Sequence, residues 1–385
     1  MAWVVCPEFG AASEVWLYRQ ATGMRRHRVR VITWNERDAE QFPAGPCEVT
    51  QVPTPFAPPG GRWRRRVRGA LSLALGRPGS TRGEMAWFRA AIGQRRPSVI
   101  LAQYGPTGIR IAPAAAAERI PLVVHFHGVD LSAMLRSAHY RRSLRVAIPR
   151  VTRFVVVAEY MRDALTRLGA ERDRIERIPY GVPLEEFPAM ARGRSPCRFL
   201  MVGRLTEKKR PDLSLRAFEL VARADADAHL TIIGGGELFA SVRELAAQGG
   251  LANRVTMLGS EPPQRVREAM EAADVFVQHS MVASNGDMEG WPVAIAEAAA
   301  SGLPIVATRH ASIPEQVAHE SSGLLCDEGD WQAMGAHMLR LAADPALRCR
   351  MGQAARERIA AFDLAGQIER LERLLCDAAA DSPGA

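Results

Sequence analysis

The chain has 385 residues, of which 47% are hydrophobic and 24% charged, and its formal net charge is +8 at pH 7. This is the composition of an ordinary globular protein, and the length allows two domains with cores of their own. No uncharged apolar run approaches the roughly 20 residues of a membrane span, no signal-peptide pattern precedes the first apolar run, and the six cysteines are scattered without a C-x-x-C pair. We therefore expect a cytoplasmic chain without a membrane span, a disulfide framework or a metal site.

The first half of the chain, residues 1–190, carries the positive charge. It holds 29 basic and 16 acidic side chains, against 21 and 26 in the remainder, and such a surface attracts anionic ligands, anionic membranes or nucleic acid. The densest run precedes the apolar stretch GALSLALG, which predicts weak association with an anionic membrane, although a solvated Arg-rich helix or loop would give the same sequence. The run consists of Arg62, Trp63, Arg64, Arg65, Arg66 and Arg68. No RNA-binding signature or zinc-finger spacing accompanies it, so no nucleic acid partner is expected.

Short apolar runs alternate with helical patterns along the chain. Strands are expected at 2–6, 27–33, 98–103, 121–126 and 152–158, and then at 197–203, 229–234, 254–259, 274–280, 303–308 and 323–327. This alternation favours an α/β fold of two doubly wound, Rossmann-like domains that face each other across a cleft. The expected parts are an N-terminal domain at 1–190, a C-terminal domain at 196–360 and a C-terminal helix at 361–385 that packs back toward the N-terminal domain. Ligands of such sheets bind beyond the carboxyl ends of the strands.

The stretch VVHFHGVDLS, residues 123–132, ends an apolar strand with His127 and Asp130. A histidine in this place is often a structural residue whose hydrogen bonds are satisfied. The alternative is a site residue, because the loop follows a strand and would face the cleft.

The stretch GRLTEKKRP, residues 203–211, contains the only two lysines of the chain. It connects an expected strand to a helix that Pro211 can open. Arg204 and Lys209 flank this turn, where a guanidinium, an ammonium and a helix N-terminus suit a phosphate. A solvated basic loop is the alternative, and Lys208 is expected to be an exposed residue of that loop.

The stretch IIGGGE, residues 232–237, lacks the full G-x-G-x-x-G spacing of a dinucleotide site. It predicts a close-packed turn.

The stretch SNGDMEGWPVAIAEAAASGLPIVAT, residues 284–308, places two carboxylates around a helix start. Pro292 can open a helix that runs to about residue 301. Glu289 precedes this helix, and Glu297 lies five residues inside it, roughly 7.5 Å along the axis. The two could hydrogen-bond the hydroxyls of an elongated ligand whose phosphates lie at the helix start, and the glycines of this loop would let backbone N–H groups approach that ligand. A glutamate on an exposed helix face is the alternative explanation.

These motifs, in this order, resemble the retaining glycosyltransferases of family 4, which have the two-domain GT-B fold. The similar segments are HFHGVD, RIPYGVPLEEF, GRLTEKKRPDLSLRAF, IIGGGE and EGWPVAIAEAAASGLPIVAT, and they extend over nearly the whole chain. SNGDMEGWPVAIAEA and SEVWLYRQ are most similar to the branch that builds bacterial exopolysaccharides of the colanic-acid type.

The resemblance implies a role for each candidate residue. Arg204 and Lys209 would bind the donor diphosphate, and Glu297 the ribose; His127 and Glu289, the catalytic candidates, would lie near the transferred sugar. Further donor contacts would come from Gly290, Trp291, Pro292 and Val293, and Asp130 would lie in the cleft of the N-terminal domain. Two departures stand out: the family's glycine after the lysine is Arg210, and EFGAASEVW replaces its glycine-rich first loop.

The resemblance also implies the reaction and its partners. A sugar would move from a nucleoside-diphosphate sugar in the C-terminal domain to a sugar, lipid-linked or small-molecule acceptor in the N-terminal domain, without a metal or other cofactor. Exopolysaccharide or other glycoconjugate biosynthesis at the inner face of the cytoplasmic membrane would fit. Glycosylation of a natural product is an alternative, and a nucleotide-sugar epimerase or a basic non-enzymatic binding protein are lesser ones.

Overall fold

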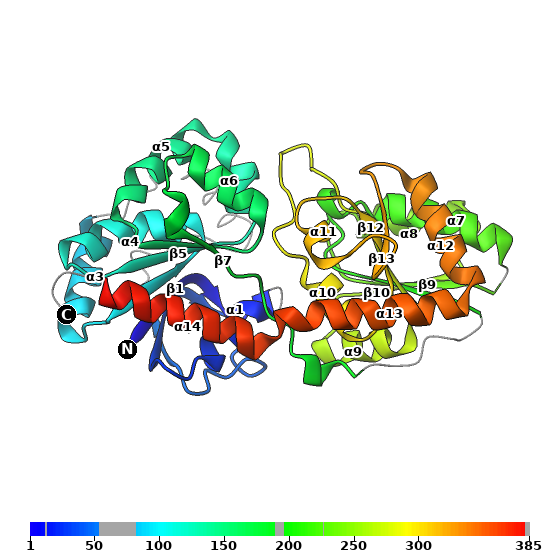
Figure 1. The fold of residues 1–385 in the computed structure, drawn as a ribbon. Coiled ribbons are helices and arrows are strands. Elements are labelled where there is room, and N and C mark those ends of the chain that lie inside the picture. The colour runs from blue at the N-terminus through cyan, green and yellow to red at the C-terminus, as the bar shows by residue number, and fades with distance from the viewer. Residues whose placement is uncertain (12–13, 54–81, 189–195, 226, 382–385) are drawn as a thin grey trace. The chain divides into compact units, whose positions relative to one another are not determined.

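The computed structural model describes residues 1–385 except 12–13, 54–81, 189–195, 226 and 382–385 (Figure 1). The basic run at 62–68 lies outside the described residues. The chain divides into two compact units. Unit 1 comprises Met1–Gly181 and Ala365–Ala385, and unit 2 comprises Val182–Leu364.

Unit 1 contains a seven-stranded parallel sheet in the order β3-β2-β1-β4-β5-β6-β7. Its strands are β1 (Ala2–Phe9), β2 (Val29–Glu36), β3 (Glu48–Gln51), β4 (Val99–Gln103), β5 (Leu122–Phe126), β6 (Arg153–Val156) and β7 (Ile175–Arg177). The described helices are α1 (Val15–Gly23), α3 (Arg82–Gln94), α4 (Gly105–Ala117), α5 (Ala138–Ala147), α6 (Glu159–Arg167) and α14 (Leu364–Ala380), whose first residue belongs to unit 2.

The central strands of unit 1 are buried along their whole length. Every residue of β4 and β5 is buried, as expected of parallel strands that are covered on both faces. The chain order reverses between β1 and β4, which is the topological switch point of a doubly wound sheet. The five strands expected in this half are present. β3 and β7 were missed because each is short and only partly apolar.

Helix α14 returns the end of the chain to unit 1. The Glu372 carboxylate accepts hydrogen bonds from the backbone N–H groups of Arg26 (2.6 Å) and His27 (3.1 Å). The guanidinium of Arg370 donates to the carbonyl oxygen of Arg177 (3.0 Å). The last helix therefore belongs to the same unit as the first strand.

Unit 2 contains a six-stranded parallel sheet in the order β10-β9-β8-β11-β12-β13. Its strands are β8 (Arg198–Val202), β9 (His229–Ile233), β10 (Val255–Gly259), β11 (Val275–Gln278), β12 (Ile305–Thr308) and β13 (Gly323–Cys326). The helices are α7 (Pro211–Ala224), α8 (Phe239–Gln248), α9 (Pro263–Ala272), α10 (Val293–Ala300), α11 (Ile313–Gln316), α12 (Trp331–Ala343) and α13 (Pro345–Ile359). All six strands expected in this half are confirmed.

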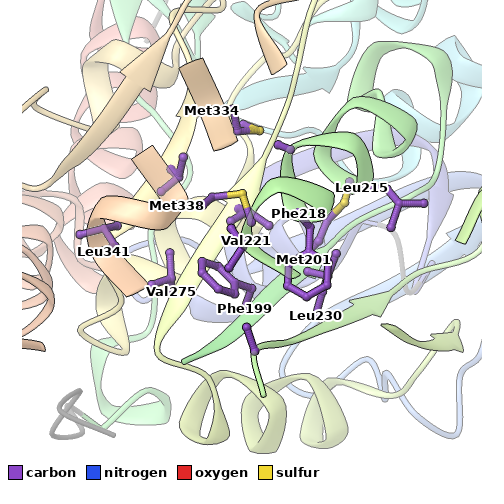
Figure 2. Close-up of a cluster of buried hydrophobic side chains, with 14 of the residues drawn as sticks. Phe199, Met201, Leu215, Phe218, Val221, Leu230, Val275, Met334, Met338 and Leu341 are labelled. Carbon is purple, nitrogen blue, oxygen red and sulfur yellow. The ribbon is translucent and has the colours of Figure 1, made fainter. Parts of the chain in front are cut away.

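The core of unit 2 joins its sheet to helices α7 and α12. Figure 2 shows Phe199 and Met201 from β8 among side chains of α7 and α12, such as Phe218 and Met338. All four are at most 1% exposed. This packing fixes α7, and with it the loop that connects β8 to α7.

None of the described helices is both long enough and apolar enough to span a bilayer.

Candidate functional site

The candidate site of unit 2 lies at the switch point of its sheet. The strands β8 and β11 are neighbours although β9 and β10 separate them in the sequence. The chain leaves β8 through loop A, residues 203–210, and leaves β11 through loop B, residues 279–292. The carboxyl ends of neighbouring parallel strands bring both loops to one edge of the sheet, where doubly wound proteins bind ligands.

Both lysines of loop A form ion pairs with loop B. The Nζ atom of Lys209 lies 3.0 Å from Oε1 of Glu289, and the two side chains are 12% and 7% exposed. The Nζ atom of Lys208 lies 3.0 Å from Oδ2 of Asp287 and 3.4 Å from the carbonyl oxygen of Met288. The expectation of an exposed Lys208 was wrong, since its side chain is only 14% exposed and holds loop B.

The Lys209–Glu289 pair is ionised in spite of its burial. Burial raises the pKa of Glu289, but Lys209 and Lys208 outweigh that effect and lower it to about 2. Burial lowers the pKa of Lys209, and Glu289 opposes this, while the nearby charges of Lys208 and Arg204 lower it further. Arg204 is thus close enough to affect Lys209, yet it is exposed and forms no ion pair within the described part of the chain. Lys209, Arg204 and Glu289 thus bring two cations and one carboxylate to this edge of the sheet.

Further hydrogen bonds join the two loops. The Glu207 carboxylate accepts from the backbone N–H and the hydroxyl of Ser284, both at 2.8 Å. The N–H of Met281 donates to the carbonyl oxygen of Lys208 (2.9 Å). The loops therefore form one connected structure, which places Lys209 and Glu289 before any ligand arrives.

Arg210 occupies a position that favours glycine. Its φ is +38° and its ψ +57°, and it forms the N-cap of α7. The guanidinium donates to Oδ1 (3.0 Å) and Oδ2 (2.8 Å) of Asp212, two residues further on. This pair of hydrogen bonds to Asp212 stabilises Arg210 in the left-handed conformation, which glycine adopts more easily because it has no Cβ.

The glycines of residues 234–236 form the close-packed turn that the sequence predicts. A Cβ on Gly234, whose φ is +140°, would lie 1.9 Å from the carbonyl oxygen of Gly203. A Cβ on Gly236 would lie 2.4 Å from that of Leu205. The backbone at 234–236 is thus packed directly against loop A.

A buried histidine holds the backbone of Glu289. The Nε2 atom of His310 accepts a hydrogen bond from the Glu289 N–H (3.1 Å), and its Nδ1 atom lies 2.6 Å from Oε1 of Glu328. The proton is therefore on Nδ1, where it is donated to the carboxylate. The other oxygen of Glu328 accepts from the N–H of Val282 (3.0 Å). Loop B is anchored at both ends through one histidine–glutamate pair.

Helix α10 follows loop B, with Pro292 as its N-cap. Gly290, Trp291 and Pro292 are buried, and Val293 and Glu297 are partly exposed. The Trp291 ring lies against Phe362, with 5.0 Å between ring centroids, so its indole packs within the unit. Pro292 has no backbone N–H. The N–H groups of the first turn of α10 have no partner within the helix and can therefore face a ligand.

In unit 1, His127 lies in an aromatic and polar cluster at the end of β5. Its ring is 4.2 Å from that of Trp16, between centroids. The Nε2 atom lies 2.8 Å from Oε1 of Gln103 and the Nδ1 atom 2.6 Å from the hydroxyl of Tyr180. Because the amide nitrogen of Gln103 donates to Gln20 (2.8 Å), Nε2 carries the proton and Nδ1 accepts from Tyr180. Burial, and secondarily His125, lower the pKa of His127 well below its ordinary value, so the ring is neutral.

Asp130 braces the same loop from inside. It is fully buried, and its carboxylate accepts from the N–H groups of His127 (2.9 Å), Gly128 (3.0 Å) and Gly105 (3.1 Å). Burial raises its pKa to about 6, against the effect of those hydrogen bonds. The carboxylate joins the loop after β5 to the start of α4.

Sequence reasoning did not single out several members of these clusters. They are Trp16, Gln103, Tyr180, Glu207, His310 and Glu328. His310 and Glu328 each follow the last residue of a strand by two positions, so the rule that ligands lie beyond strand ends could have found them. Nothing in the sequence indicates that Glu207 meets Ser284. Among the described residues, no three His, Cys, Asp or Glu side chains are grouped as metal ligands would be.

Two family models match the chain. The "Glycosyl transferase 4-like domain" model matches residues 9–181, and the "Glycosyl transferases group 1" model matches residues 186–358. Together they extend over both units.

Several characterised proteins are similar in sequence. The amylovoran biosynthesis glycosyltransferase AmsK of Erwinia amylovora is 34% identical over 57% of this chain and 54% of its own length. The putative colanic acid biosynthesis glycosyltransferase WcaL of Escherichia coli is 32% identical over 63% of this chain and 61% of its own. A GDP-mannose-dependent phosphatidylinositol monomannoside mannosyltransferase of Mycolicibacterium smegmatis is 30% identical over 71% of each chain. The matched region is thus less than two thirds of AmsK or WcaL.

A solved structure shares the fold over the whole chain. HepE of Anabaena, crystallised with UDP and glucose, superposes with a TM-score of 0.76 and covers 98% of this chain and 100% of its own, at 19% identity.

Proposed function

The chain belongs to the retaining glycosyltransferases of family 4, and we propose that it transfers a sugar from a nucleoside-diphosphate sugar to an acceptor hydroxyl with retention of anomeric configuration. The observation that carries the proposal is the buried Lys209–Glu289 pair at the switch point of unit 2.

The donor diphosphate is assigned to Lys209 and Arg204. The ammonium of Lys209 is fixed by loop A and by Glu289, and its lowered pKa reflects a desolvated charge that a phosphate would compensate. Arg204 is exposed and close enough to add a second positive charge. The first turns of α7 and α10 add backbone N–H groups to this edge.

The sugar and ribose are assigned to the two glutamates. Glu289 is ionised at neutral pH, because its pKa is about 2, so both oxygens can accept hydrogen bonds from sugar hydroxyls. Glu297 lies further along α10 and is partly exposed, at a spacing that suits the ribose hydroxyls. Gly290, Trp291, Pro292 and Val293 would line the sugar subsite through their backbone. In unit 1, His127 is the candidate for contact with the transferred sugar.

The proposed donor-binding groups stabilise the charge that develops when the donor loses its diphosphate. When the bond between the anomeric carbon and the diphosphate oxygen breaks, negative charge develops on the diphosphate. Cations and helix ends that are already in place stabilise that charge without reorganising. The joined loops A and B supply this preorganisation. The acceptor hydroxyl attacks from the face that the diphosphate leaves, and its proton passes to the departing diphosphate oxygen as the new glycosidic bond forms.

The pathway is assigned by similarity. AmsK and WcaL are named for amylovoran and colanic acid biosynthesis, and this similarity supports a role in bacterial exopolysaccharide assembly. The acceptor would then be a growing, lipid-linked saccharide.

The proposal is tested with the purified full-length chain and a panel of UDP, GDP, dTDP and ADP sugars. We expect one donor to raise the melting temperature of the wild type and to be slowly hydrolysed. Lys209→Ala should lose both effects, whereas Arg216→Ala, which removes an exposed charge from the outside of α7, should keep them. Equal activity of Lys209→Ala and wild type would refute the diphosphate assignment, and epimerised donor in place of hydrolysed donor would indicate an epimerase.

The ribose assignment is tested separately. Glu297→Ala should weaken donor binding by about 10-fold or more, since a hydrogen bond to a charged group contributes about 1.5–3 kcal/mol. Calorimetric titration with the donor found above measures this affinity. An unchanged affinity would contradict the role of Glu297.

A further inference from the structure

Unit 1 carries a hollow between two helices that the proposed sugar transfer does not use. The hollow has a volume of about 330 Å³. Helix α4 contributes Ile109, Ala112 and Pro113, and the segment of α5 and the turn after it contribute Arg142, Val146 and Arg150. Its floor is therefore aliphatic and its rim basic.

The segment that contains α5 has an unusual charge pattern. Between Asp130 and Glu159 the chain has six arginines and not one acidic residue. The arginines are Arg136, Arg141, Arg142, Arg145, Arg150 and Arg153. Arg153 belongs to β6 and forms an ion pair with Asp381; the other arginines give the α5 segment a positive charge that attracts anions over a distance of a Debye length.

No described acidic side chain forms an ion pair with Arg142 or Arg150, the two arginines at the hollow. Arg142 is exposed and forms no ion pair in the part of the chain that the structure describes. Among the described residues, the one hydrogen bond of the Arg150 guanidinium goes to the carbonyl oxygen of Val146 (2.6 Å). Both positive charges thus remain for a ligand from outside.

The helix also exposes an apolar residue beside these charges. Val146 is 57% exposed, the highest fraction among the exposed large hydrophobic side chains of the described chain. Residues 142, 146 and 150 recur every four positions, so they form one stripe along the segment. The opposite side of α5 is anchored by Tyr140 and Leu144, which are buried.

We propose that this face is a docking site for an anionic phospholipid bilayer. The headgroup phosphates would contact Arg142 and Arg150, and Val146 and the aliphatic floor would receive the glycerol and upper acyl region of a lipid. Proteins bind the surface of such a membrane through basic residues that lie beside exposed apolar ones. Among the described residues that line the hollow the one aromatic ring is that of His139, which is hydrogen-bonded to Ser143 (3.2 Å), so there is no series of rings on which successive nucleic acid bases could stack. A free anion would make no favourable contact with Val146 or with the aliphatic floor.

The site goes beyond the donor chemistry and does not depend on it. A lipid-linked acceptor would, however, be delivered to a protein held at the bilayer. The residues that form this face, 142–150, are not those of the basic run at 62–68, which lies outside the described residues.

The test is cosedimentation of the full-length chain with vesicles of equal parts phosphatidylglycerol and phosphatidylcholine, against vesicles of phosphatidylcholine alone. We expect binding to the anionic vesicles only. Arg142→Glu changes the local charge by two, so affinity should fall about 30-fold, the equivalent of about 1 kcal/mol per charge. The matched control is Arg167→Glu, an exposed arginine at the end of α6, which should change affinity much less. Val146→Ser should weaken binding several-fold without a change in charge.

Several results would overturn the proposal. One is an Arg142→Glu variant that is folded by circular dichroism and binds vesicles as the wild type does. A second is a Val146→Ser variant with full vesicle binding together with displacement of the protein by millimolar inorganic phosphate, which would indicate a free-anion site. A third is loss of nucleic acid binding or of self-association in Arg142→Glu while vesicle binding persists. Donor hydrolysis without vesicles should be unchanged in Arg142→Glu, which separates failure of this site from failure of the transferase proposal.

Discussion

Replacing Lys209 with methionine isolates the buried charge pair of unit 2. Methionine keeps much of the length and apolar bulk of the lysine side chain and removes the ammonium that lies 3.0 Å from Glu289. Glu289 would then be a buried carboxylate without its closest cation. We expect the variant to fold with a less stable unit 2.

The magnitude follows from the pKa of Glu289. The folded value is about 2 and the ordinary value 4.5, and at about 1.4 kcal/mol per pKa unit this difference corresponds to about 3 kcal/mol of stability. Burial lowers the pKa of Lys209, so removing the ammonium also relieves its desolvation, which offsets part of the loss. We expect a loss of about 1–3 kcal/mol at neutral pH.

The pH dependence has a definite sign. A carboxyl group with a lowered folded pKa contributes its full stability above its unfolded pKa, and that contribution is lost as the pH falls through the folded pKa. Without Lys209, burial raises the folded pKa of Glu289 in the variant, so the difference in stability between wild type and Lys209→Met should be largest where Glu289 is ionised in both proteins. It should shrink as the pH falls from that raised pKa to about 2, the folded pKa in the wild type.

The assay is urea unfolding followed by circular dichroism, with the double variant Lys209→Met/Glu289→Gln as control. Removing both charges leaves no unpaired buried carboxylate, so the double variant should be more stable than the single one. A single variant as stable as the wild type at pH 7, or a double variant less stable than the single, would refute the reasoning.

Two further substitutions test how the site is held. Gly234→Ala should destabilise unit 2 by on the order of 4 kcal/mol or more, because the new Cβ would lie 1.9 Å from the Gly203 carbonyl oxygen; Gly250→Ala, also at positive φ but with no atom within 4 Å, should cost about 1 kcal/mol, and equal urea midpoints for the two would contradict the close packing. His310→Ala should lower kcat by about 10- to 100-fold through displacement of Glu289 while KM for the donor changes less, and His310→Gln, which keeps an acceptor for the Glu289 N–H, should recover part of the loss. If kcat in His310→Ala is unchanged, His310 does not position Glu289.

Much of the fold could be predicted because its signals are local. Continuous apolar runs such as those of β4 and β5 indicate buried parallel strands, and Pro211 and Pro292 mark where helices begin. β3 was missed because an edge strand of four partly exposed residues, EVTQ, has no such run. The candidate residues Arg204, Lys209 and Glu289 could be singled out for the same local reason, since each lies in a loop that follows a recognisable strand, and Glu297 lies in the helix that Pro292 opens.

The contacts among those residues were decided by the tertiary structure. The sequence determined that Lys208 and Lys209 follow β8 and that Glu289 follows β11, some 80 positions later. Only the adjacency of β8 and β11 in the sheet brings these loops together, so Lys208 is a partly buried partner of Asp287 instead of the exposed residue expected. The hollow beside α5 also combines both contributions. The sequence alone shows that residues 131–158 include no acidic residue. The aliphatic floor from α4 exists only because α4 and α5 pack together.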